Sequence, residues 1–228
     1  MSRFFRLLKA TLYKEWKTLL SRGLAGLVGF VFVVPGVMLG KALSVADTEP
    51  LAAMSGALFA IFVSAMVGML ATLRFWEEKG YGTLESLFAL PYGVRSLFLA
   101  KLALPFLVGF FISCVFIVFN LLWLPSLGLG RTWAVCMVAV TAVSGWVLAF
   151  ESVTLVGYAM WMMSETAAKW AQMVVMGFYG GAMALPILGV SVSIGALLSV
   201  LSAMVLLLGV LCFFALRALS TERIVLNA

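Results

Sequence analysis

Charged side chains are scarce in this sequence, and those away from the ends of apolar runs mark where chemistry could occur. One is Glu151, which stands inside an apolar stretch of the 228-residue chain. Others belong to the segment FWEEKGYGTLES, which contains Glu77, Glu78 and Glu85. The sequence has no histidine, which excludes histidine-based triads, proton relays and histidine metal sites. Cys114, Cys136 and Cys212 lack metal-ligand spacing, so we expect neither catalytic residues nor a metal site.

Nucleotide chemistry is also not expected of this chain by itself. It contains no G-x-x-x-x-G-K-[ST] phosphate loop, because the glycines of GYGTLES and LGLGRTW lack the following lysine. We therefore predict that the chain is not an enzyme and holds no cofactor.

Composition shows what must position these few polar groups. Apolar residues make up 64% of the chain and charged residues 11%, whereas soluble domains are about half apolar and about a quarter charged. Several apolar runs approach or exceed the roughly 20 residues that cross a bilayer. The net charge of +6 does not indicate nucleic-acid binding, because the basic residues sit at the ends of apolar runs. We predict an all-α integral membrane protein surrounded by lipid, without a cleavable signal peptide.

The apolar runs predict a single transmembrane domain, 1–228, with six spans. Before the first span, residues 3–20 have helical period, with apolar residues on one stripe and basic residues opposite. Such a helix lies in the membrane interface, or packs on a partner protein. The spans are expected at about 24–40, 51–73, 97–123, 132–163, 170–188 and 191–216, with a polar break at 164–169.

The basic residues predict how the spans are oriented. With six spans and a cytoplasmic N-terminus, 13 of the 15 Lys and Arg residues lie on the inside, and only Lys41 and Arg131 lie outside. Inner loops of membrane proteins carry this excess of positive charge. We therefore expect a multi-pass protein of the cell inner (cytoplasmic) membrane with both termini in the cytoplasm.

The segment 75–96 between the second and third spans is predicted to present a short cytoplasmic helix. Gly80 and Gly82 end the preceding helix, and Thr83 can cap a new one. That helix would run from Leu84 to Ala89 or Leu90, because Pro91 stops it. Leu84, Leu87 and Phe88 would share one apolar face. The residues alone leave two uses for this face equally open: docking on a partner, or lying against the bilayer or the bundle.

The same stretch resembles the corresponding segment of ABC-2-type exporter permeases. Those proteins share an acidic and basic cluster, a Gly-Thr-Leu-Glu sequence, a proline, and a lysine that opens the next span. Layout agrees too, with an N-terminal helix bearing Lys14, Glu15 and Trp16, then six spans. The matching residues of the segment are Glu77, Glu78, Lys79, Gly82, Thr83, Leu84, Glu85, Pro91 and Lys101.

The resemblance implies a coupling helix that docks on a separate ATPase (nucleotide-binding) subunit, which would hold the ATP and Mg. On that view Leu84, Leu87 and Phe88 fill a groove of the ATPase, while Glu77, Glu78 and Glu85 pair with basic residues at its rim. A second permease copy or a paralogue would complete the pathway. Two patches of small residues suit that contact, although packing within the chain is the better explanation for either patch taken singly. They consist of Gly23, Gly26 and Gly29, and of Gly177, Gly180 and Gly181.

Glu151 has two interpretations. An acidic residue in an apolar span is functional by default, which predicts a wall of the substrate pathway or a gate contact. The other interpretation is a capping or snorkelling residue at a helix break, with Ser152 and Thr154 nearby.

Three other functions compete with the ABC exporter subunit. One is the haem-exporter membrane subunit of cytochrome c maturation. The resemblance to that subunit is weaker, because it carries a longer, aromatic-containing outer segment where this chain has only a short turn between the fifth and sixth spans. A secondary transporter would need intramembrane charge pairs and repeats, and the sequence shows neither. A membrane scaffold without transport activity is the third. The identity of the substrate does not follow from the residues.

Overall fold

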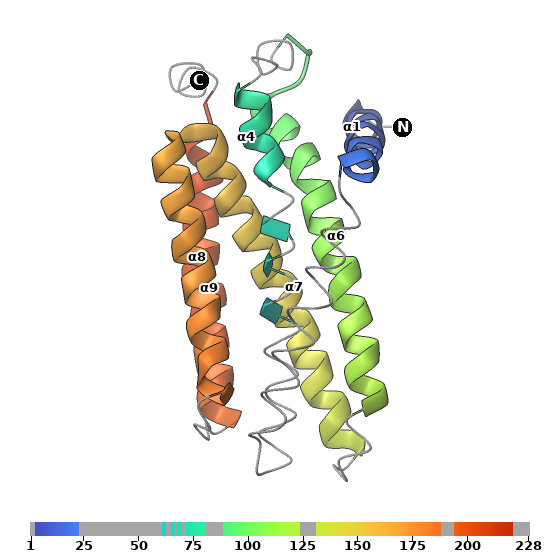
Figure 1. Cartoon of the computed structure of the whole chain (residues 1–228), viewed down its shortest axis with the longest axis vertical. Helices are drawn as coiled ribbons and strands as arrows, with labels where there is room; N and C mark the ends of the chain where they lie inside the picture. Colours follow the sequence, from blue (N-terminus) through green and yellow to red (C-terminus); the bar gives the residue numbers. More distant parts are fainter. Residues whose placement is uncertain are drawn as a thin grey trace.

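The chain folds into α-helices wherever its structure is described. A computed structural model describes residues 3–22, 61–62, 65–66, 68–69, 72–80, 89–123, 131–187 and 194–220, and these contain no strand. Residues 61–62, 65–66 and 68–69, which fall in the predicted second span, are helical as well. The helices are α1 (Arg3–Arg22), α4 (Leu73–Gly80), α6 (Val94–Trp123), α7 (Arg131–Met162), α8 (Glu165–Ile187) and α9 (Ile194–Ala218), as Figure 1 shows.

Helix α7 occupies the centre of the bundle. It runs obliquely (Figure 1) and contacts α4, α6, α8 and α9. Four consecutive residues of α7, 151–154, are all buried. Successive helical residues point about 100° apart, so burial of all four means that α7 is enclosed on every side at this level. A polar group on this stretch must find its partners inside the protein.

Three of the described helices contain stretches long and apolar enough to cross a membrane, namely Val94–Val115, Ala142–Met162 and Leu198–Ala218. Helix α9 exposes a broad apolar surface that includes Leu206, Phe213 and Phe214. A contiguous apolar surface of this kind is unfavourable in water and favourable against lipid. These features indicate that the protein is associated with a membrane.

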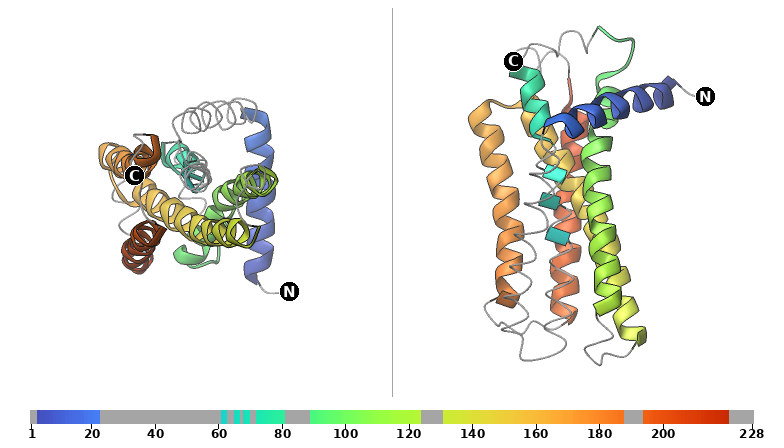
Figure 2. Two further views of the ribbon diagram at one scale, coloured as in Figure 1. Left: turned by 90° about the horizontal axis from the view of Figure 1, so that it is seen from below. Right: turned by 45° about the vertical axis from the view of Figure 1, so that its right-hand side comes forward.

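Helix α1 confirms the helix predicted at 3–20 and lies across one end of the bundle instead of along it (Figure 2). Leu7 packs against Leu97 and Ala100 of α6. The aromatic part of the apolar stripe, including Phe5 and Trp16, remains exposed. The stripe is therefore divided, because one edge packs on α6 and the rest points outward.

The other predicted boundaries compare as follows. The first span, 24–40, and most of the second, 51–73, lie outside the described residues. The third, fourth and sixth correspond to α6, α7 and α9. Helix α4 is described as far as Gly80, and the predicted end of the helix beyond it lies outside the described residues. A turn at Thr72, whose hydroxyl donates to the Met69 carbonyl at 2.6 Å, precedes that helix.

Two local predictions are wrong. The polar stretch 164–169 does not break the chain throughout, because α8 already begins at Glu165. A serine before a first-turn glutamate favours a helix start, and Lys169 pairs with Glu165 at 2.5 Å across one turn. In addition, Ala89 and Leu90 lie in a turn and a bend, so the coupling helix cannot extend to either residue. A residue before proline avoids helical geometry.

Close packing around α7 depends on glycine at position 68. A Cβ atom placed on Gly68 would overlap Cγ2 of Val153 on α7. Val153 is buried and β-branched, so it has little freedom to turn aside. The second-span residues can therefore approach α7 closely only because this position has no side chain.

We predict that Gly68→Ala lowers the midpoint of thermal unfolding in detergent, measured by intrinsic tryptophan fluorescence. Forcing a methyl group into a packed interface costs about 1–3 kcal/mol. Val153→Ala added to Gly68→Ala should recover part of the loss by making room. The matched control is Gly195→Ala on α9, where no described residue lies within 4 Å of the added Cβ. A Gly68→Ala protein that melts like the control would contradict this prediction.

Candidate functional site

An ion pair joins the two helices on either side of the predicted coupling helix. Glu78 in the last turn of α4 pairs with Lys101 in the second turn of α6. Both side chains are largely sequestered, with 17% of Glu78 and 7% of Lys101 exposed. Opposite charges interact more strongly when they are withdrawn from water. The pair therefore holds α4 against α6 near the points where the intervening segment leaves and returns.

Lys79, the neighbour of Glu78, connects α4 to α7. Its ammonium donates a hydrogen bond of 3.0 Å to the carbonyl oxygen of Met163, one residue beyond the end of α7. The ammonium also lies 5.6 Å from the centre of the Trp76 ring. Only 6% of Lys79 is exposed, and this burial lowers the pKa of the amine from its ordinary value. Helix C-termini leave carbonyl groups unpaired, and Lys79 satisfies a carbonyl just past this end.

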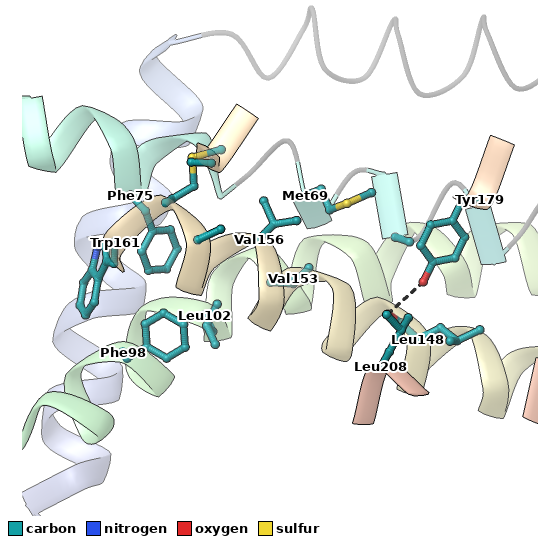
Figure 3. Packing of buried hydrophobic residues seen from close by; sticks show 14 of the residues in the cluster. Met69, Phe75, Phe98, Leu102, Leu148, Val153, Val156, Trp161, Tyr179 and Leu208 are labelled. Carbon is teal, nitrogen blue, oxygen red and sulfur yellow. Dashed lines mark hydrogen bonds between the residues drawn. The ribbon is translucent and has the colours of Figure 1, made fainter. Parts of the chain in front are cut away.

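Three aromatic rings fill the space between the same helices. Phe75 of α4, Phe98 of α6 and Trp161 of α7 contact one another in Figure 3, with ring centres 5.3–5.9 Å apart. These separations suit edge-to-face and tilted arrangements, which add to the stability gained by burial. These three rings and the three charged residues described above form a group that we call the α4 anchor. Its six members are Phe75, Glu78, Lys79, Phe98, Lys101 and Trp161.

The same end of the bundle has a further connection between helices. Arg95 at the start of α6 donates a hydrogen bond of 3.2 Å to the carbonyl of Arg217 near the end of α9. A charged donor next to a helix C-terminus is favourable. Helices α4, α6, α7 and α9 are thus linked at the end where α1 also lies (Figure 1).

Glu151 lies at the contact between α7 and α9. Only 7% of the residue is exposed. A Cβ atom on Gly209 would stand 2.9 Å from its Oε1 atom, so the carboxyl group reaches the α9 backbone. Its Oε2 atom has no hydrogen-bond partner in the part of the chain that the structure describes. Cys212 donates from its thiol to the Glu151 carbonyl at 3.1 Å.

The polar neighbours of Glu151, by contrast, are hydrogen-bonded. The Tyr179 hydroxyl on α8 donates to the Leu148 carbonyl at 3.2 Å, the dashed line in Figure 3. The Ser152 hydroxyl is hydrogen-bonded to the Tyr179 hydroxyl, with 2.6 Å between their oxygen atoms. Thr154 donates to the Phe150 carbonyl at 2.7 Å. A buried acceptor without a partner is costly, which distinguishes Glu151 from these groups.

The structure also changes the choice between the two interpretations of Glu151. Helix α7 is continuous from Arg131 to Met162, so Glu151 does not cap a helix break. Its burial likewise excludes a snorkelling side chain. The interpretation as a wall of the substrate pathway or a gate contact stays a prediction, and the structure adds that Glu151 lies at the α7–α9 contact with one carboxyl oxygen lacking a described partner.

The predicted coupling residues are described only in part. Gly82, Thr83, Leu84, Glu85, Leu87 and Phe88 lie outside the described residues. Glu77 is exposed on α4, and Pro91 lies in an exposed turn before α6. Glu78 faces Lys101 and not the surface, so Glu77 is the exposed one of the two glutamates.

The sequence does not predict the partners of Glu78 and Lys79 on other helices. The resemblance assigns Lys101 only the role of opening a span, although its charge is opposite to that of Glu78. The acceptor of Lys79 is a backbone carbonyl, for which no side-chain pattern exists. Among the described residues no group of three or more His, Cys, Asp or Glu could hold a metal.

The fold and these contacts define an all-helical protein, within its described ranges, with three helices apolar enough to cross a membrane. Comparisons with models of protein families, with curated proteins and with solved structures found no match to this chain.

We predict that Lys101→Met lowers the free energy of unfolding by about 3–5 kcal/mol, because it leaves the largely buried Glu78 carboxylate without its cation. Adding Glu78→Gln should recover most of the loss. Denaturant titration in detergent micelles measures both effects.

The matched control for this prediction is Lys169→Met, which breaks the exposed pair with Glu165. An exposed pair of this spacing contributes only about 0.3–0.5 kcal/mol. Equal losses for the two lysine variants would show that the Glu78–Lys101 pair is no more important than a surface pair.

Proposed function

We propose that this chain is the transmembrane subunit of an ATP-driven exporter of the ABC-2 type, which forms the substrate pathway and couples to a separate ATPase subunit. The observation that carries the proposal is the Glu78–Lys101 ion pair. Both residues belong to the segment that resembles ABC-2 permeases, and their pairing supplies a physical reason for an acidic and a basic residue at these two positions. It holds together the two helices through which a docked ATPase would act.

The proposal includes six spans and a cytoplasmic position for both termini. The distribution of Lys and Arg supports that orientation. The arrangement in Figure 2 agrees with it, because α1 and the final turn of α9 lie at the same end of the bundle as the α4 anchor. On this proposal that end faces the cytoplasm, and the exposed Phe5, Tyr13 and Trp16 of α1 lie at headgroup depth.

The proposed transport step uses the end of the bundle that is held by the α4 anchor. ATP-driven closure of two ATPase subunits displaces the segment between α4 and α6 and switches the pathway between inward and outward access. A second copy or a paralogue of the permease completes the pathway. Gly177, Gly180 and Gly181 of α8 are exposed, with no described residue near their Cα hydrogens, and a small-residue surface suits close helix contact.

Glu151 is the proposed pathway or gate residue. Its unsatisfied carboxyl oxygen lies at the α7–α9 contact, and functional residues commonly retain groups that are unfavourable for stability alone. If α7 and α9 separate during transport, the Glu151 carboxyl becomes available to polar groups of the cargo.

Affinity co-purification from the native cells tests the exporter assignment. We expect an ATPase subunit to accompany the wild-type chain and to be lost with Leu87→Arg, because a charge on the predicted apolar face prevents docking. Ser86→Arg, on another face of the same predicted helix, is the matched control and should retain the subunit. Absence of any ATPase with the wild-type chain in mild detergent would reject the exporter in favour of a secondary transporter or a scaffold.

A transport assay tests the role of Glu151. In inverted membrane vesicles, Glu151→Gln should reduce ATP-dependent uptake of rhodamine 6G or of a fluorescent phospholipid analogue, while ATPase binding is retained. Gly209→Ala should act in the same direction, because the added methyl group displaces the carboxyl. Gly195→Ala, on the same helix with open space around it, is the control. Unchanged uptake by the Gln variant would remove Glu151 from the pathway.

A further inference from the structure

Lys79 is the member of the α4 anchor whose individual role the exporter proposal leaves undefined. It occupies the last turn of α4, and its buried ammonium donates to Met163 of α7 at 3.0 Å. Hydrogen bonds from a charged donor are directional and roughly twice as strong as neutral ones. The contact therefore fixes the end of α4 to one particular atom of α7, whereas an apolar contact could slide.

The position of Met163 makes this attachment effective. The Met163 amide donates to the Ala159 carbonyl at 2.9 Å, so the residue is still part of the last turn of α7. Helix α8 begins at Glu165, which leaves two residues between α7 and α8. A displacement of the Met163 carbonyl therefore moves the end of α7 and the start of α8 together.

The rest of the α4 anchor restricts other movements of α4. The Glu78–Lys101 pair holds α4 to α6, and Phe75 packs on Trp161, whose side chain is fully buried. These contacts tie α4 to the end of α7 at several points. Glu151 lies 12 residues before Met163, roughly 18 Å along the axis of α7, and a continuous helix transmits displacement over that length.

We infer that Lys79 is a positioning residue that fixes the last turn of α4 to the junction of α7 and α8. A displacement of α4 is thereby passed to α7 and to its contact with α9 at Glu151. The inference rests on the proposed function for the source of the displacement, namely the ATPase subunit. The contact itself belongs to residues of this chain alone.

Hydrogen exchange measured by mass spectrometry tests the inference without knowledge of the cargo. The sample is the complex purified with its ATPase subunit, with and without trapping by ATP and vanadate. For the wild type we expect trapping to change exchange at the amides of residues 158–168. Lys79→Met keeps the apolar stem and removes the donor, so it should lose this difference while still binding the ATPase and hydrolysing ATP.

Three further variants separate transmission from a general loss of structure. Lys79→Arg keeps a charged donor and should retain the trapping-dependent difference. Lys169→Met removes an exposed lysine of α8 and should behave like the wild type. If Lys79→Met does not assemble, Lys79→Gln replaces it, since its shorter side chain does not span the distance to Met163, and it should lose the difference.

The outcomes distinguish the two proposals. Absence of an ATPase subunit or of ATP hydrolysis in the wild-type sample refutes the exporter assignment and, with it, the source of the displacement. An active wild-type complex without any change at 158–168 overturns the inference alone. So does a change of equal size in Lys79→Met, or in Lys79→Gln where that variant is used.

Discussion

Enclosure of α7 by its neighbours is the constraint on which the described structure depends. Since α4, α6, α8 and α9 all contact this helix, every polar group along its buried stretch must be satisfied from within the protein. Ser152, Tyr179 and Thr154 meet that requirement through short hydrogen bonds. The Oε2 atom of Glu151 and the indole nitrogen of Trp146 do not meet it among the described residues, and of these two only the Glu151 oxygen belongs to an ionisable group.

Helix α7 makes different kinds of contact along its length. At the end near α4, the Lys79 ammonium donates to a backbone carbonyl, and the Glu78–Lys101 ion pair holds α4 against α6. Around Glu151, the contact with α9 combines the close approach of Gly209 with a hydrogen bond from the Cys212 thiol to the Glu151 carbonyl. A charged donor forms a stronger hydrogen bond than a neutral one, so the contacts near α4 specify the position of α7 more firmly.

Periodicity and composition were sufficient to predict the helices whose surroundings are uniform. Helices α6, α7 and α9 follow from runs of apolar residues, and α1 follows from the helical period of residues 3–20, because neither pattern requires knowledge of neighbouring helices. The start of α8 differs from the prediction because the polar stretch 164–169 suggests a break between helices. In the structure Glu165 and Lys169 instead pair across one turn and stabilise the start of the helix. The Glu78–Lys101 pair and the Lys79–Met163 bond could not be predicted, because they depend on how α4 lies against α6 and α7. A sequence pattern also cannot tell that a carboxyl group such as that of Glu151 faces a glycine on another helix.

The contact between Glu151 and Gly209 has a consequence for biosynthesis. Ribosomes make the chain from its N-terminus, so α7 is complete before α9, which begins at Ile194, has emerged. Until that helix has been made, the side of α7 that carries Glu151 lacks the cover that α9 provides. Helix α9 then covers the carboxyl group and supplies the Cys212 thiol to the neighbouring carbonyl. The surroundings of Glu151 are therefore completed only when the last of the described helices has been synthesised.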